Sequence, residues 1–183
     1  MVATGVHWLR MPLPFALDHI NLWLLEDGDH WVIVDCGIGN DSTTALWQQV
    51  IESTMGSRKV SRVIATHHHP DHVGNAGWLT RRFNAPLLIS QSEYYSAHAL
   101  CDGTAGHGRE QLSALYRRNG LDEAFVPGIL NGRENFKKSV PYFPLSYSRI
   151  FEGERIKIGT NHWRVIIGYG HAPEHASLYC EEL

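Results

Sequence analysis

The chain has 183 residues, 43% of them hydrophobic, so it is long enough for one domain with a core and too short for two. Its 16 basic and 19 acidic residues give a formal net charge of −3, which argues against a surface built for nucleic acid or anionic lipid. The opening residues do not resemble a secretory signal, and no stretch approaches the ~18 apolar residues of a spanning helix. We therefore expect a single cytoplasmic domain, residues 1–183, that binds neither nucleic acid nor membrane.

The elements predicted by hydrophobic periodicity alternate between strands and helices. In chain order they are a hairpin of strands 20–25 and 31–35, a helix from an N-cap among 40–42 to about 55, a strand at 60–65, a helix at 74–83, a strand at 86–90, and strands at 155–158, 162–167 and 177–180. Residues 91–135 are broken by glycines and are interpreted as a mobile helical insertion. This order predicts an α/β or α+β layered fold.

The segment THHHPDHVG, residues 66–74, crowds four histidines and an aspartate together directly after a predicted strand. In an extended loop alternate side chains point the same way, so His67 and His69 can share one metal ion while His68 faces the opposite side. After the proline turn, Asp71 and His72 can address a second position nearby. Imidazole and carboxylate are ligands of borderline divalent metals, and the spacing therefore suggests two adjacent ions.

A distant partner for this cluster is offered by GYGHAPEH, residues 168–175. His171 follows a predicted strand and a glycine and precedes a proline turn, so it can be carried to the end of the sheet. A third imidazole there would complete the ligand set of the first ion.

These segments resemble the sequence motifs of a known family. The pattern Thr-His67-x-His69-x-Asp71-His72 is similar to the signature of the metallo-β-lactamase superfamily, and Gly-His171-Ala-Pro-Glu-His175 resembles its downstream histidine motif. The strand Val-Ile-Val-Asp35-Cys-Gly resembles the apolar strand that precedes both. The resemblance extends to enzymes of the hydroxyacylglutathione hydrolase type.

The resemblance implies an αββα sandwich with a two-metal site at its sheet ends. The first ion would take His67, His69 and His171, and the second would take Asp71 and His72. Asp35 is expected to lie close to the site and to contact the ligands without binding metal itself, although it could equally be a strand-end carboxylate satisfied by backbone N–H groups. His175 is expected to be a supporting hydrogen-bond residue. Glu174 stands where the family often has glycine.

The chemistry that follows from such a site is hydrolysis of an ester, thioester or lactone by a metal-bound hydroxide. Asp71 is placed to orient the hydroxide and to accept its proton. The ions are expected to be zinc, with iron or manganese as alternatives. The insertion at 91–135 could cover the site as a lid, or its aromatic residues could be ordinary packing. Those aromatic residues are Tyr94, Tyr95, Tyr116 and Phe125.

The pattern also departs from the family. Members continue into a strand whose aspartate bridges both ions and later supply another histidine, whereas this sequence stops at Leu183. We therefore expect an N-terminal portion of the sandwich with an incomplete second metal site. A second copy or a C-terminal segment could complete it, or the chain could be a non-catalytic metal-binding or assembly fragment. In the catalytic case the partner is a small-molecule substrate.

Overall fold

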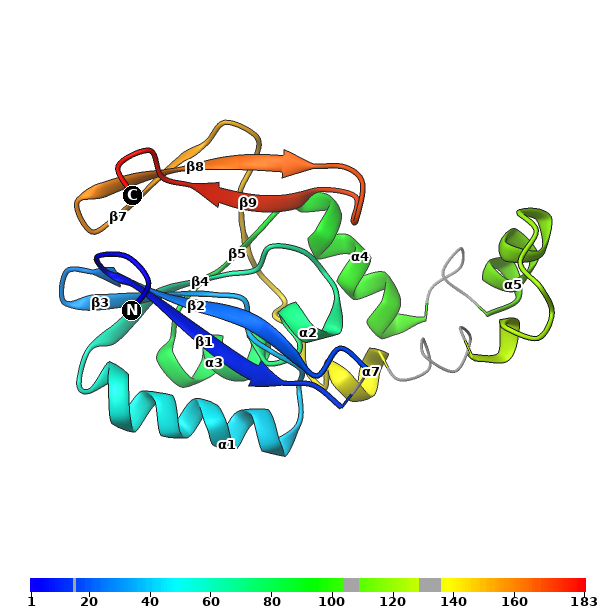
Figure 1. Cartoon of the computed structure of the whole chain (residues 1–183), viewed down its shortest axis with the longest axis horizontal. Coiled ribbons are helices and arrows are strands. Elements are labelled where there is room, and N and C mark those ends of the chain that lie inside the picture. The colour runs from blue at the N-terminus through cyan, green and yellow to red at the C-terminus, as the bar shows by residue number, and fades with distance from the viewer. Residues whose placement is uncertain (15, 104–108, 129–135) are drawn as a thin grey trace.

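A computed structural model describes residues 1–14, 16–103, 109–128 and 136–183, and its larger sheet has six strands (Figure 1). Their order in the sheet follows the chain: β1 (Val6–Pro12), β2 (His19–Asp27), β3 (His30–Val34), β4 (Lys59–Ile64), β5 (Leu87–Ile89) and β6 (Ser148–Arg149). Strands β1 to β3 pair antiparallel, and β3 to β6 pair parallel. The carboxyl ends of β3, β4 and β5 therefore meet at one edge of the sheet.

A second sheet of three antiparallel strands lies over the first one (Figure 1). It consists of β7 (Arg155–Ile158), β8 (Asn161–Gly168) and β9 (His175–Tyr179). Apolar side chains of the two sheets form one buried cluster, which includes Leu25, Val32, Ile64, Ile156 and Val165. The alternation of buried and exposed residues along β7 is what one sheet face packed on a core requires.

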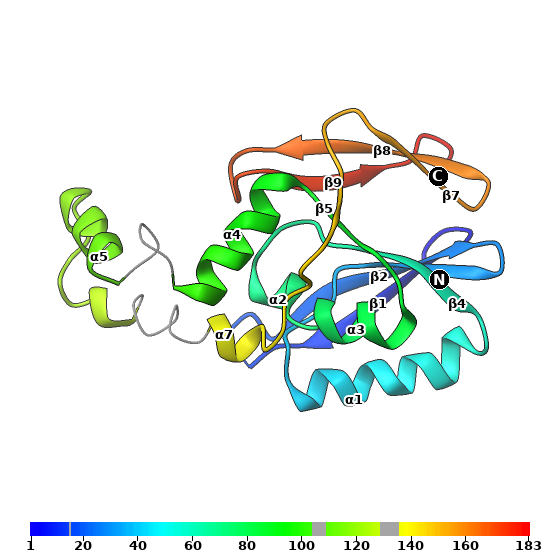
Figure 2. The ribbon, with the colours of Figure 1, turned by 180° about the vertical axis from the view of Figure 1, so that it is seen from behind.

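Helices α1 (Asp41–Val50) and α3 (Ala76–Phe83) cover the other face of the six-stranded sheet (Figure 2). Helix α1 is continued by the π-helical turn η1 (Ile51–Met55). The other described helices are α2 (Pro70–Val73), α4 (Gln91–Asp102), α5 (Arg109–Arg118) and α7 (Phe136–Ser139). The Asn40 side chain caps α1 by accepting the N–H of Thr43 at 2.8 Å. Trp47 of α1 and Leu79 of α3 belong to a second buried cluster, in which these helices pack against the sheet.

The layers are thus helices, a six-stranded sheet and a three-stranded sheet, which confirms the predicted α/β layered fold class. Within the described ranges, no helix covers the outer face of the three-stranded sheet (Figures 1 and 2). Tyr179 of β9 is 48% exposed there. The described layers therefore correspond to a helical layer and the two sheets of the expected αββα sandwich.

Most of the predicted elements lie within two residues of the observed ones. Two strands were missed, β1 and β6, and the helix expected at 74–83 is preceded by the separate short helix α2. The strand expected from residue 177 begins at His175, so this histidine belongs to the sheet.

The region 91–135 is not uniform. Helix α4 packs on the core through Tyr94 and Ala97, whereas α5 stands apart from both sheets in the two views (Figures 1 and 2). Residues 104–108 and 129–135 of the expected insertion lie outside the described part of the chain. Among the described helices, none is both long and apolar enough to cross a membrane.

Candidate metal centre

The two histidine-bearing loops meet at the edge where the parallel strands end. Asp35 follows β3, and Thr66 to His69 follow β4 and lead into α2. The loop that carries His171 connects β8 with β9 of the other sheet, and the N–H of Ala176 donates to the carbonyl of Thr66 at 2.8 Å. The edge beyond the carboxyl ends of parallel strands is where ligands bind in open α/β sheets.

His67, His69 and His171 converge as expected of three metal ligands. His67 Nε2 lies 3.0 Å from His69 Nδ1 and 3.1 Å from His171 Nε2. One nitrogen of each ring lies within 4.8 Å of those of the other two. The sequence interval of 104 residues between His67 and His171 is closed by the packing of the two sheets.

The donor set fits a divalent metal ion. His67 is completely buried, and its pKa lies far below the usual range because of burial and of the neighbouring His72 and His69. Burial and the neighbouring His68 and His171 lower the pKa of His69 to about 4. Neutral imidazoles that turn nitrogen atoms toward a common point are what a zinc-type ion binds.

A second group of possible ligands adjoins the triad, since the rings of His67 and His72 are 4.0 Å apart. The Asp35 carboxylate lies 2.8 Å from His72 Nδ1, which leaves Nε2 of the same ring at 3.5 Å from Asp71 Oδ2. Burial opposes protonation of His72, but the charge of Asp35 and its hydrogen bond outweigh burial and raise the pKa of His72. Asp71 and His72 therefore bring one carboxylate oxygen and one imidazole nitrogen within 3.5 Å of each other, and the His72 ring adjoins the triad.

Asp35 combines the two roles that the sequence left open. Its carboxylate supports His72, and it also accepts the backbone N–H of Thr66 at 2.8 Å. Its φ of 64° lies in the left-handed region, which is uncommon outside glycine and is characteristic of sites where backbone geometry is held by its surroundings. The side chain is almost fully buried.

Thr66 is a site residue that sequence reasoning missed. Its hydroxyl lies 2.9 Å from both Asp35 Oδ2 and His67 Nδ1, and 3.3 Å from His72 Nδ1. A hydroxyl in contact with the second nitrogen of a ligand imidazole fixes the orientation of that ring. The only signal in the sequence was its place directly before the histidines.

His68 and His175 are also placed by the structure. His68 turns away from the triad and contacts the buried carboxylate of Glu93, so the expectation that it faces the other side agrees with the structure. The ring of His175 lies 4.7 Å from that of His67 and 6.0 Å from that of His171. It adjoins the triad without belonging to its converging nitrogens.

The aromatic residues that could have formed a lid lie in different environments. Tyr94 is a core residue: its ring stacks on Tyr147 at 3.9 Å, and its hydroxyl donates to the carbonyl of Pro144 at 3.1 Å. Tyr95 and Phe125 are exposed. For Tyr94, packing is therefore the correct interpretation.

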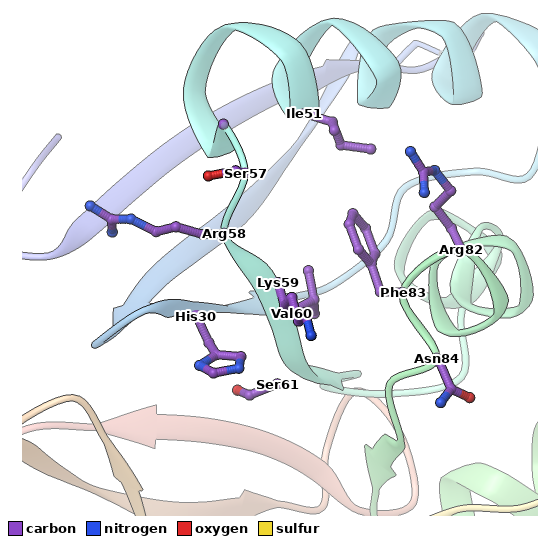
Figure 3. A pocket seen from close by; sticks show the side chains of 11 residues that line it. His30, Ile51, Ser57, Arg58, Lys59, Val60, Ser61, Arg82, Phe83 and Asn84 are labelled. Atoms are coloured by element: carbon purple, nitrogen blue, oxygen red, sulfur yellow. The ribbon is translucent and has the colours of Figure 1, made fainter.

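Two cavities differ in their relation to the histidines. The larger, about 570 Å³, lies where β3 and β4 begin, at the end of the sheet opposite to the triad (Figure 3). Arg58, Lys59 and Arg82 line it. The smaller, about 360 Å³, lies between the two sheets and reaches Thr66 and His175, so it adjoins the metal centre.

The depressed pKa values predict a loss of stability in acid for the metal-free protein. An unfolded chain protonates histidine near pH 6.5, whereas folded His69 stays neutral down to about pH 4. The unfolded state therefore binds more protons, and the free energy of unfolding should fall between pH 6.5 and 4, by at most about 3 kcal/mol for His69. Urea unfolding in the presence of a chelator measures this.

The quantity to compare is the change in the free energy of unfolding between pH 6.5 and 4 in the wild-type chain and in His69→Asn. The variant serves as the reference because carboxylates elsewhere in both proteins also respond to acid. The wild-type chain should lose more stability than this variant over the same pH window. Because the pKa of His72 is raised, this residue contributes a change in stability of the opposite sign, and it does so in both proteins. Equal pH slopes for the two proteins would contradict the prediction.

Comparisons with known proteins identify the family of the chain. The sequence model described as the metallo-beta-lactamase superfamily matches residues 16–183. Probable metallo-hydrolase YqjP of Bacillus subtilis (strain 168) is 26% identical over 193 residues, which cover 100% of this chain and 55% of that protein. The crystal structure of a Beta-lactamase domain protein from Burkholderia ambifaria is 40% identical with a TM-score of 0.82, and the match covers 99% of this chain and 53% of that one.

A metallo-beta-lactamase family protein from Thermus thermophilus is similar as well, with 26% identity, a TM-score of 0.79 and coverage of 100% of this chain and 57% of that one. The match to a hydroxyacylglutathione hydrolase of Thiobacillus denitrificans, 32% identical, covers only 42% of this chain. The narrower resemblance to that enzyme is therefore partial, and the chain spans about half the length of the relatives that match it throughout. The family sequence match and the shared fold lead to one conclusion: this chain belongs to the metallo-beta-lactamase superfamily.

Proposed function

We propose that the chain is the metal-binding part of a hydrolase that cleaves a small ester, thioester or lactone. The observation that carries the proposal is the approach of His67 Nε2 to His69 Nδ1 and His171 Nε2, at 3.0 and 3.1 Å. Three neutral imidazoles whose nitrogens converge in this way are a typical ligand set of a zinc-type ion. The name of the Bacillus subtilis relative, a probable metallo-hydrolase, is consistent with it.

His67, His69 and His171 would hold one ion, and Asp71 and His72 would hold a second. Bound ions of this kind supply Lewis-acid polarisation and lower the pKa of water toward neutrality. The protein's part is to keep the ligands neutral and oriented. Burial does the first for His67, and the hydroxyl of Thr66 does the second.

Asp71 is the residue that we assign to proton transfer. Asp71 is the second residue of α2 and is partly exposed. Its carboxylate lies beside His72 Nε2. A carboxylate in that position can orient an attacking water and take its proton. Asp35 cannot do so, because its oxygens are engaged by Thr66 and His72.

A small-molecule substrate is favoured by the cavity of about 360 Å³ between the sheets, which reaches the metal centre at Thr66 and His175. Ligand cavities of about 300–1,000 Å³ with mostly apolar walls are typical of small-molecule sites. Trp23, Leu25 and Leu178 supply such walls. Zinc suits the nitrogen-rich triad best, while iron and manganese accept the same ligands.

A non-catalytic metal-binding or assembly fragment is the competing function, and a specific observation favours it. The second position has only Asp71 and His72 from the described chain, and the chain covers 55% of the Bacillus subtilis relative. In the hydrolase, a second copy or a further segment would contribute the remaining ligand.

The test combines metal content with turnover. Elemental analysis of protein purified without added metal gives the number of ions per chain, and a panel of esters, thioesters and lactones is assayed with and without a chelator. The proposal expects bound metal and chelator-sensitive hydrolysis. Bound metal with no hydrolysis, in the presence of added zinc, iron or manganese, supports the competing function, and a chain that binds no metal contradicts both.

A further inference from the structure

Glu93 is a completely buried carboxylate on the first turn of α4, next to the two histidine loops. Its Oε2 accepts the backbone N–H of His68 at 2.9 Å and lies 2.5 Å from Nδ1 of the same residue. Its Oε1 accepts the backbone N–H of Glu174 at 2.6 Å. One side chain therefore bonds to both loops.

The two loops belong to different sheets, so their relative position is not set by strand pairing. His68 stands between the ligands His67 and His69 at the end of β4, and Glu174 stands three residues after His171, before β9. The direct backbone bond between the loops at this edge runs from Ala176 to the carbonyl of Thr66. Glu93 adds a second link, which joins His68, between the two ligands of the first loop, to Glu174 of the second loop.

The loop that carries His171 is further fastened to the start of α4. The backbone N–H of Ser92 donates to the Glu174 carboxylate, and the Ser90 hydroxyl donates to the Glu174 carbonyl, both at 2.9 Å. Figures 1 and 2 both show the first turn of α4 beside the start of β9. A glycine at 174 would lack the carboxylate that makes the first of these bonds, so this contact is particular to the glutamate of this chain.

All three partners of Glu93 are hydrogen-bond donors, which is the environment of an ionised carboxylate. Burial alone would raise its pKa, but the hydrogen bonds from His68 and from the Glu174 N–H outweigh burial and hold the pKa below its usual range. The oxygens of the carboxylate are occupied by these donors, and Glu93 is not among the groups that converge at the triad, so we take it as a residue that supports the metal centre without being a ligand.

We propose that Glu93 is a positioning residue that fixes the loop of His67 and His69 relative to the loop of His171, so that the three imidazoles are already in place before an ion binds. The inference rests on the proposed function in taking the triad as the metal site. Preorganised ligands bind more tightly because less ordering remains to be done on binding. A purely structural Glu93 would instead change the stability of the fold and leave the metal affinity of the folded chain unchanged.

The decisive variant is Glu93→Gln. The amide keeps one acceptor oxygen but sets an NH₂ donor against a backbone N–H, because Glu174 and His68 both donate from the main chain. The zinc dissociation constant is measured by competition with a chromogenic chelator, below the melting temperature of each variant as defined by circular dichroism. We expect zinc binding weakened about 10- to 100-fold, as for other groups that support ligands. The visible spectrum of the cobalt(II)-substituted triad should change as well.

The matched control is Glu52→Gln, an exposed glutamate in η1 that makes the same charge change away from the site. It should bind zinc as the wild type does. Unchanged zinc affinity and an unchanged cobalt spectrum in folded Glu93→Gln would overturn the inference. A wild-type chain that binds no zinc would instead overturn the proposed function, so the two failures are distinguishable.

If Glu93→Gln does not fold, His68→Ala tests the same link. This variant removes only the imidazole bond and leaves both backbone bonds to Glu93 in place. It should fold and bind zinc about tenfold more weakly, at the lower end of the range for groups that support ligands, because two of the three bonds of Glu93 remain. Wild-type affinity in folded His68→Ala would overturn the inference in this case.

Discussion

Replacing His171 with alanine should remove tight metal binding while leaving the fold intact. The side chain is exposed, so its loss costs little packing, yet its Nε2 is one of the three nitrogens that converge at the triad. Structural zinc sites with four ligands bind with about 10–16 kcal/mol, or roughly 3 kcal/mol for each ligand. We therefore expect zinc affinity to fall at least about 100-fold, measured by chelator competition and by elemental analysis after dialysis.

His162→Ala is the matched control, since His162 is an exposed histidine of β8 on the same sheet as the His171 loop. It should retain the metal content and the melting temperature of the wild-type chain. If His171→Ala keeps wild-type zinc affinity while remaining folded, the triad is not the metal site. In that case the close approach of the three rings would need another explanation.

Most of the proposed ligands could be identified from the sequence because they are local. His67, His69, Asp71 and His72 lie within six residues, and the alternation of an extended loop followed by a proline-initiated helix already separates them into two groups. His171 could be chosen only as a histidine at the end of a predicted strand, and the family resemblance then supported it, since only the packing of two sheets closes the interval of 104 residues to His67.

The supporting residues could not be predicted in this way. Glu93 lies in a helical segment rich in polar residues, where a glutamate is normally solvent-exposed, and its burial depends on contacts with His68 and Glu174 from distant parts of the chain. Thr66 was visible only as the residue before the histidines. Such roles are defined by tertiary contacts and leave no periodic signal.

The missed strands have a similar cause. In β1 (Val6–Pro12) only Val6 and Met11 are buried, so the strand has no strict alternation of apolar and polar residues. It ends in a proline, which is tolerated because β1 is an edge strand. Strand β6 has two residues and is defined by its pairing with β5 alone. Pairing partners, and not local pattern, determine both strands.

Asp71→Asn should abolish most of the hydrolysis while sparing the triad. The amide keeps an oxygen near His72 Nε2 but cannot accept a proton from an attacking water at neutral pH. Loss of a proton acceptor lowers kcat by about 10²- to 10⁴-fold. The measurement is kcat on the best substrate of the panel, together with the zinc content of the purified variant.

The two readouts separate proton transfer from metal binding, because Asp71 is also a proposed ligand of the second ion. If kcat falls while the zinc content is that of the wild type, proton transfer is the role that was lost. If zinc content falls by one ion and added zinc restores kcat, Asp71 acts mainly as a ligand, and its assignment as proton acceptor is wrong. Asp29→Asn, an exposed aspartate in the turn between β2 and β3, is the matched control and should change neither quantity, since that turn lies at the opposite end of β3 from Asp35.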